Sequence, residues 1–149
     1  MFKVGLKMSE KKIRIIIDTN ILISGLYFHE LPKKFFREID LEKFNLCVNQ
    51  EIIDEYIDKI DNKFSKSKYI LDKDLREKIF SGFKSFEKIS NLKVCRDPDD
   101  DKFINCAIDA KAIYIVSGDN DLLTLKNFDG IEIVTAREFY DKYIKPSAM

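Results

Sequence analysis

The sequence predicts an α/β fold, a Rossmann-like three-layer sandwich in which helices cover a central parallel sheet of four to five strands. Short apolar runs alternate along the chain with segments whose apolar residues repeat at helical spacing, as strand–helix–strand crossovers require. Several runs are apolar almost throughout, which is typical of strands covered on both faces. The chain has 149 residues, of which 45% are hydrophobic, and this suits one domain with one core.

The first half of the chain is expected to hold two strands and three helices. The run Ile-Arg-Ile-Ile-Ile-Asp at 13–18 is rich in β-branched residues and nearly free of polar alternation. Thr19 and Asn20 suit the cap of the next helix, and Pro32 suits the first turn of another. The expected strands are 13–18 and 44–48, and the expected helices are 21–28, one beginning at 32, and 49–60.

The second half is expected to continue the alternation. Asp97-Pro98 interrupts it with a non-helical step, because the residue before a proline avoids the α region. Thr135 and Glu138 have the spacing of a capping box and open the last helix. The expected strands are 92–95, 112–116 and 131–134, and the other helices are 72–89 and 99–111.

These elements form one expected domain, residues 13–145. Residues 1–12 are polar and predict a flexible N-terminal extension, in which Met8 is an alternative start to Met1. This extension lacks the apolar core of a secretory signal, and no apolar stretch of the chain approaches the roughly 20 residues of a membrane span. Three widely spaced cysteines suit buried thiols in a reducing compartment. The expected location is the cytoplasm.

Composition excludes several classes of enzyme. A single histidine makes a Ser-His-Asp or Cys-His triad improbable, and the cysteine spacing does not suit a zinc site. Neither a G-x-G-x-x-G nor a G-x-x-x-x-G-K-[ST] phosphate loop is present. The chemistry that remains is that of carboxylates.

Acidic residues fall where a parallel sheet binds its ligands, beyond the carboxyl ends of the strands. Asp18 ends the first strand and Asp119 follows the fourth. Asp101 falls on the packed side of the helix after the proline. In the 49–60 helix, Asp54 and Glu55 lie on opposite flanks of the apolar face, and spacing admits either of them.

A gathering of acids without basic partners predicts a metal site. Neighbouring carboxylates repel and raise one another's pKa, and a divalent cation relieves this. Oxygen ligands suit Mg²⁺ or Mn²⁺, which retain waters and bind substrate phosphate. Such an ion activates water and stabilises the charge of a phosphoryl displacement. The pattern therefore points to phosphodiester hydrolysis.

Four segments resemble, in order, the motifs of the PIN-domain ribonucleases, the toxin class of VapC-type toxin–antitoxin pairs. They are Ile15–Ser24, Arg96–Ile104, Ile115–Leu123 and Ile131–Phe139, and the resemblance covers about 13–140. It implies a PIN-like fold and an Mg²⁺- or Mn²⁺-dependent endoribonuclease that cleaves RNA. It also implies a toxin role, with an antitoxin protein and a second copy of the chain as candidate partners.

The resemblance assigns roles to individual residues. It implies four catalytic acids that also hold the metal, namely Asp18, Glu55, Asp101 and Asp119. Among the two acids that spacing left open, it therefore favours Glu55. Asn20 and Ser117 match supporting polar positions. Asp121 matches either a fifth acid or a helix cap, and the cap is favoured.

The Lys-rich middle of the chain has two interpretations. A net charge of zero argues against nucleic-acid binding by bulk charge, but Lys63, Lys66 and Lys68 are candidates for local RNA contact. The other interpretation is a solvated helical hairpin. An alternative function is a catalytically weak PIN-like module that binds RNA or protein. A phosphatase that phosphorylates Asp18 is disfavoured, because Asn20 stands where it needs a second Asp.

Overall fold

The sheet is built outward from β1 (Ile13–Ile17), whose two neighbours come from distant parts of the chain. The computed structural model describes residues 11–27, 31–63 and 71–145. Within them, six strands follow the order β3-β2-β1-β4-β6-β5, and every neighbouring pair is parallel except β5 with β6. The other strands are β2 (Phe44–Val48), β3 (Phe83–Ser85), β4 (Tyr114–Val116), β5 (Asn127–Phe128) and β6 (Ile131–Val134).

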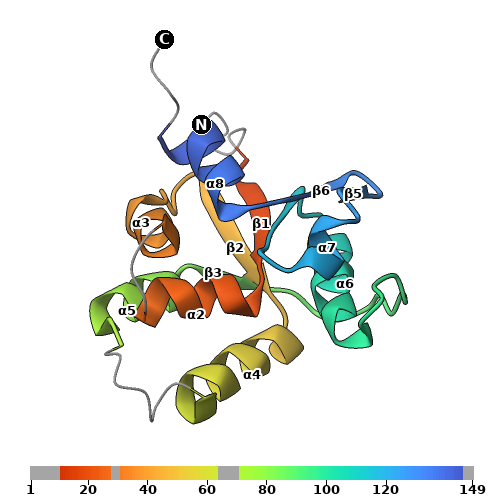
Figure 1. Ribbon diagram of the computed structural model, residues 1–149, viewed down its shortest axis with the longest axis horizontal. Helices are drawn as coiled ribbons and strands as arrows, with labels where there is room; N and C mark the ends of the chain where they lie inside the picture. The colour runs from red at the N-terminus through yellow and green to blue at the C-terminus, as the bar shows by residue number, and fades with distance from the viewer. Residues whose placement is uncertain (1–10, 28–30, 64–70, 146–149) are drawn as a thin grey trace, which may run out of the picture.

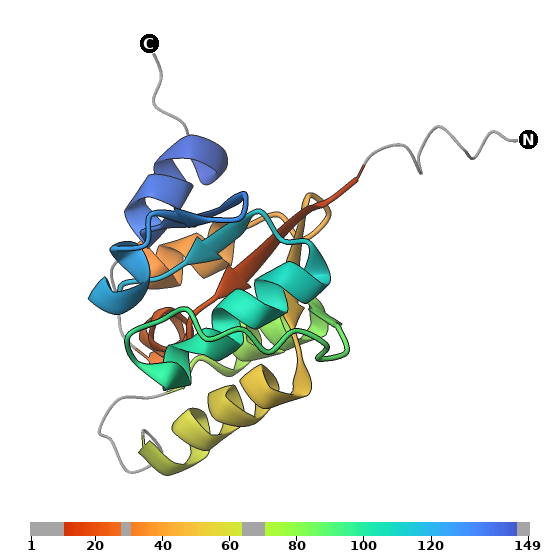
Figure 2. The same cartoon turned by 90° about the vertical axis from the view of Figure 1, so that its right-hand side faces the viewer.

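Helices cover both faces of the sheet, which confirms the predicted three-layer α/β architecture (Figures 1 and 2). Helix α6 packs on β1, β2 and β4, and α3 lies on the opposite side of the sheet. The α-helices are α2 (Thr19–Tyr27), α3 (Leu31–Glu38), α4 (Gln50–Asp58), α5 (Lys73–Ser81), α6 (Asp101–Ala110), α7 (Asn120–Leu123) and α8 (Ala136–Phe139). Three short turns are η1 (Lys59–Lys63), η2 (Pro98–Asp100) and η3 (Tyr140–Ile144).

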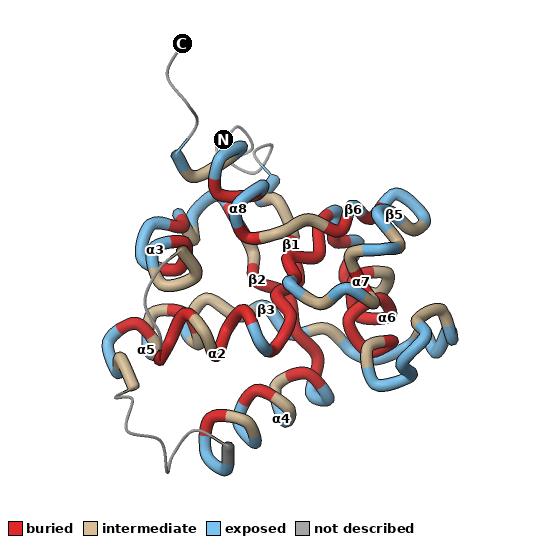
Figure 3. The backbone as a smooth tube through the Cα atoms, viewed as in Figure 1, coloured by how far each residue is buried: buried red, intermediate tan, exposed pale blue. Residues whose placement is uncertain are grey.

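The core is centred on β1 and β2, as their unbroken apolar sequence predicts (Figure 3). Ile15 and Ile16, whose side chains point to opposite faces of the sheet, are both fully buried. The removal of each from water stabilises the fold by about 1.5–3 kcal/mol. Tyr56 on α4 is also buried, and its hydroxyl donates to the Ile17 carbonyl at the end of β1. This bond fixes α4 against the carboxyl edge of the sheet.

The third strand lies earlier in the chain than the sequence predicted. Helix α5 ends at Ser81 and does not continue to 89, and Phe83 then pairs with Leu46 of β2. Gly82 allows the backbone at this transition to approach Leu41 closely, because a Cβ at this position would lie 2.6 Å from Leu41 Cδ1.

The segment predicted as a strand at 92–95 is an extended loop held by side chains. The Leu92 amide donates to Asn105 Oδ1 at 2.8 Å. The amides of Val94 and Cys95 donate to Asp101 Oδ1 at 3.0 and 2.7 Å. The prediction was wrong here because side chains of α6 replace the neighbouring strand as hydrogen-bond acceptors, and hydrophobic pattern does not report such partners.

The remaining differences are at element ends. The strand predicted at 112–116 is confined to 114–116, and the short β5 was not predicted. Residues 1–10, with Met1 and Met8, lie outside the described residues. Among the helices of the described part, none combines the length and the hydropathy needed to cross a bilayer.

Candidate metal centre

The candidate site lies where the order of the strands reverses. The chain places β2 on one side of β1 and β4 on the other, and open α/β sheets bind ligands beside such a switch point. Ile17 and Val116 are paired at the ends of the two strands, and the Asp18 amide donates to the Val116 carbonyl at 3.0 Å. The residues that follow the two strands, Asp18 and Ser117, are therefore adjacent.

Asp18 is a buried carboxylate, with 3% of the residue exposed. It accepts hydrogen bonds from the Ser117 hydroxyl and, at 2.9 Å, from the Ile21 amide. Burial raises the pKa of Asp18 despite these bonds, and the charge of Asp119 adds to the shift. The described surroundings thus supply too little positive charge for this carboxylate.

Asp119 is tied to Asp18 through Ser117, whose Oγ accepts the Asp119 amide at 2.9 Å. Asp119 also caps α7, since its carboxylate accepts the Asp121 amide at 3.1 Å. The preference for Asp121 as the cap was therefore wrong. A cap must precede the first helical residue, and Asp121 is inside the helix.

The carboxylate of Asp121 instead joins a second group of acids. Oxygen atoms of Asp97, Asp100 and Asp121 all lie within 4.8 Å of one another. Arg96 Nη2 lies 2.7 Å from Asp121 Oδ1, and its side chain is 86% exposed. The η2 turn brings Asp97 and Asp100 toward α7, so this group completes the acidic cluster at the switch point.

Asp100 joins this group to Asp119. Burial raises the pKa of Asp100 to about 7, and a hydrogen bond with Asp119 and the charges of Asp119, Asp97 and Asp121 add to the shift. Its Oδ2 is buried and has no hydrogen-bond partner among the described residues. A hard divalent cation fits this donor set, because it would satisfy the orphaned oxygen and neutralise the neighbouring acids.

Asp101 lies on the packed side of α6, as its spacing predicted, and is 8% exposed. Its carboxylate accepts the amides of Val94 and Cys95. Burial opposes ionisation, but these two bonds lower the pKa of Asp101. The two amides therefore occupy one oxygen, Oδ1, of the acid that the resemblance assigned to the metal, whereas Oδ2 of its neighbour Asp100 has no partner among the described residues.

Glu55 reaches the site from α4 and is held by two donors. It accepts a hydrogen bond from the Thr19 hydroxyl, and Lys102 Nζ lies 2.6 Å from its Oε1. Asp54, the alternative that spacing left open, accepts a bond from Gln50 on the exposed side of the helix. Glu55 is thus at the inner side of the centre, paired with an ammonium group.

A cleft of about 550 Å³ opens beside the acids, lined by Asn20, Ile21, Ser24, Arg96, Gly118, Asp119, Asn120 and Asp121. The supporting residue Asn20 is at its mouth, whereas Ser117 is buried beneath it. Sequence pattern did not single out three residues of this centre, Asp97, Asp100 and Lys102. The available signal was Pro98, which predicts a turn and so leaves open which of the following acids faces the site.

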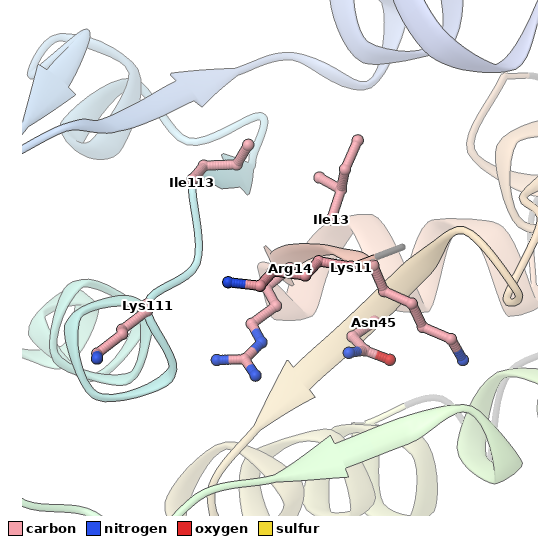
Figure 4. A pocket seen from close by; sticks show the side chains of 7 residues that line it. Lys11, Ile13, Arg14, Asn45, Lys111 and Ile113 are labelled. Carbon is pink, nitrogen blue, oxygen red and sulfur yellow. The ribbon is translucent and has the colours of Figure 1, made fainter. Parts of the chain in front are cut away.

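Basic residues gather at the opposite, amino edge of the sheet (Figure 4). A cleft of about 610 Å³ is lined there by Lys11, Lys12, Ile13, Arg14, Asn45, Lys111 and Ile113. Among the described residues, a group of basic side chains therefore lies at the amino edge of the sheet and a group of acids at the carboxyl edge. Of the predicted RNA contacts, Lys66 and Lys68 lie outside the described residues. Lys63 ends η1, and its side chain is also outside the description.

Comparison with known proteins gives two findings. The sequence model of the PIN domain matches residues 14–121 of this chain, a range that includes every acid of the centre. The uncharacterized protein MJ1680 of Methanocaldococcus jannaschii is 35% identical over 153 residues, and the match covers 93% of this chain and 97% of that protein.

Proposed function

Since the chain belongs to the PIN-domain family, as its motifs predicted, we propose that it is an endoribonuclease that requires Mg²⁺ or Mn²⁺. PIN domains are generally metal-dependent nucleases. The observation that carries the proposal is the buried Oδ2 of Asp100, which has no hydrogen-bond partner in the described part of the chain and lies within a cluster of carboxylates at the switch point. Without a cation, this arrangement leaves several negative charges uncompensated.

The proposed metal ligands are Asp18, Asp100 and Asp119. Asp18 and Asp119 are the acids expected from the motifs, and Asp100 takes the role first expected of Asp101. The free oxygen of Asp100 supports this exchange, as does the engagement of Asp101 by two amides. The Ser117 hydroxyl orients both Asp18 and Asp119, because it donates to the Asp18 carboxylate and accepts the Asp119 backbone amide. Asp97 and Asp121 add two further carboxylates beside Asp100, on the side of the cleft.

A bound divalent ion would supply an activated water and would stabilise the negative charge that develops on the phosphate. The chain itself would position the substrate. Arg96, exposed beside Asp121 at the cleft, offers a planar set of donors suited to phosphate. Asn20 offers an amide at the same mouth. These groups would hold an RNA backbone across the acids.

The biological setting that we propose is that of a toxin paired with an antitoxin protein, acting as one copy or two. The three cysteines are all unpaired, which supports a reducing cytoplasm as the compartment. Lys63, Lys66 and Lys68 remain proposed RNA contacts.

Incubation of the purified chain with end-labelled RNA, in Mn²⁺ or in EDTA, tests the activity. Single-stranded and hairpin RNAs should both be included. We expect cleavage in Mn²⁺, none in EDTA, and a loss of orders of magnitude in Asp119→Asn. RNA binding without any cleavage in Mn²⁺ would favour the alternative, a binding module that has lost catalysis.

A further inference from the structure

Lys102 is a buried lysine at the inner side of the centre, with 7% of the residue exposed. Its Nζ lies 2.6 Å from Glu55 Oε1, 2.8 Å from Asp99 Oδ1 and 2.8 Å from the Asp99 carbonyl oxygen. An ammonium group has three hydrogens to donate, so these contacts use its full capacity. Lys102 thereby joins α4 to the η2 turn, which carries Asp100.

The pairing leaves Glu55 poorly suited to bind a metal ion. Its Oε1 is held by Lys102 and its Oε2 by the Thr19 hydroxyl. A metal ion bound to Glu55 would compete with an ammonium group already beside this carboxylate, and an ion that displaced it would leave a buried lysine unpaired, which is unfavourable. Asp100 presents the opposite case, a buried carboxylate oxygen for which the described residues supply no hydrogen-bond partner.

The centre thus has two sides with different charge balance. On the side of Asp97, Asp100 and Asp121, carboxylates lie together, and within the described part of the chain their one ion pair is with the exposed Arg96. On the side of Glu55, a buried lysine already supplies the positive charge. Only the first side calls for an external cation.

We propose that the ammonium group of Lys102 takes the place of a second metal ion, so that this protein binds one divalent ion per chain. The inference rests on the proposed function, since it concerns the same centre. Lys102 acts as a positioning residue: it neutralises Glu55 and, through the Asp99 carbonyl, holds the turn that presents Asp100. Glu55 is then a partner of Lys102 and not a metal ligand.

The number of bound ions tests this directly. Mn²⁺ is titrated into the full-length protein, and free Mn²⁺ is followed by its electron paramagnetic resonance signal. We expect one ion for the wild type, and one ion of similar affinity for Glu55→Gln. Asp119→Asn should lower the affinity for this ion by at least about tenfold.

Substitution of the lysine provides the complementary test. Lys102→Met removes the ammonium group but keeps an unbranched side chain, and we expect it to admit a second, weaker Mn²⁺ beside Glu55. The double variant Glu55→Gln/Lys102→Met should return to one ion. Lys111→Met, which removes a charge at the other end of α6, is the matched control and should bind one ion.

The outcomes separate this inference from the proposed function. Two ions in the wild type, or a Glu55→Gln variant that loses Mn²⁺ as Asp119→Asn does, would overturn the role of Lys102 and leave the nuclease proposal standing. A folded Lys102→Met variant with one ion would do the same. If Lys102→Met does not fold, the wild type and Glu55→Gln decide the matter. No Mn²⁺ binding by the wild type would overturn both proposals.

Discussion

Ser117 donates its hydroxyl hydrogen to the carboxylate of Asp18 across the boundary between β1 and β4. The same oxygen accepts the amide of Asp119 at 2.9 Å. One small side chain therefore sets the positions of two acids that come from strands about 100 residues apart in sequence. Because Asp18 is buried, the loss of this donor would leave a carboxylate oxygen without its partner.

Ser117→Ala is expected to lower both stability and metal affinity. The free energy of unfolding should fall by about 1–3 kcal/mol, the cost of an unsatisfied buried acceptor, as measured by urea denaturation. The pKa of Asp18 should rise further, so Mn²⁺ binding near pH 7 should weaken. Ser81→Ala is the control, because that exposed hydroxyl only donates to the Lys78 carbonyl. Equal stability in both variants would contradict the role of Ser117.

Mn²⁺ should stabilise the folded chain, since only folding brings these acids together into a binding site. An excess of 100-fold over Kd adds about 2.7 kcal/mol, and calorimetry should show this as a rise of several degrees in Tm. Asp119→Asn should show a much smaller rise. A Tm that does not respond to saturating Mn²⁺ in the wild type would count against the metal centre.

Asp100 and Asp101 are adjacent residues with opposite expected phenotypes. Asp100→Asn should abolish the stabilisation by Mn²⁺ while leaving the metal-free protein equally or more stable. Asp101→Ala should destabilise the protein by about 1–3 kcal/mol, because two amides of the 92–95 segment lose their acceptor. The measurements are urea unfolding and the Mn²⁺ dependence of Tm. The reverse pattern would restore Asp101 as the ligand.

The metal-free protein should lose stability as the pH rises through about 7, the folded-state pKa of Asp100. The pKa of this acid is higher in the folded state than in the unfolded one, so its burial penalises the ionised form. The decline is expected between about pH 4 and pH 7, the unfolded and folded pKa values of this acid, with a plateau above, and it should be reduced in Asp100→Asn. A pH profile identical in both proteins would show that Asp100 does not titrate in this range.

The Lys-rich segment can be tested against the basic cleft at the amino edge. Lys63, Lys66 and Lys68 replaced together by Gln should weaken RNA binding and flatten its salt dependence, since each lost phosphate contact removes about 0.7 from the slope on a single strand. Fluorescence anisotropy at several salt concentrations measures both. A matched triple replacement of Lys11, Lys12 and Lys111 should leave the slope unchanged. If instead only this second set lowers the slope, RNA follows the amino edge.

The sequence alone determined the layers of the fold and one half of the centre. The unbroken apolar run of β1 predicted a strand covered on both faces, and Ile15 and Ile16 are buried accordingly. Asp18 and Asp119 follow two such runs, and the carboxyl ends of parallel strands share one edge of a sheet. Their place at one edge of the sheet therefore follows from chain order, and the pairing of β1 with β4 in the structure makes them neighbours.

Only the tertiary structure shows which neighbours the acids of the Asp99–Asp101 run contact. The η2 turn is a 3₁₀ turn that advances about 120° per residue, and α6 after it advances about 100°. A helical projection of α6 therefore places Asp101 on the packed side, as observed, but it does not extend to Asp100, which lies in the turn. Asp101 turns toward the amides of Val94 and Cys95, and Asp100 toward Asp119.

The pairing of Glu55 with Lys102 also depended on the fold, because 47 residues separate them. Nothing in either local pattern marks the other as its partner. Helical spacing placed Glu55 on the flank of α4 and could not distinguish it from Asp54. The contact between α4 and α6 then buries one flank beside Lys102 and leaves the other in solvent. Periodicity fixes which face of a helix is buried, but only packing between helices fixes which charges meet there.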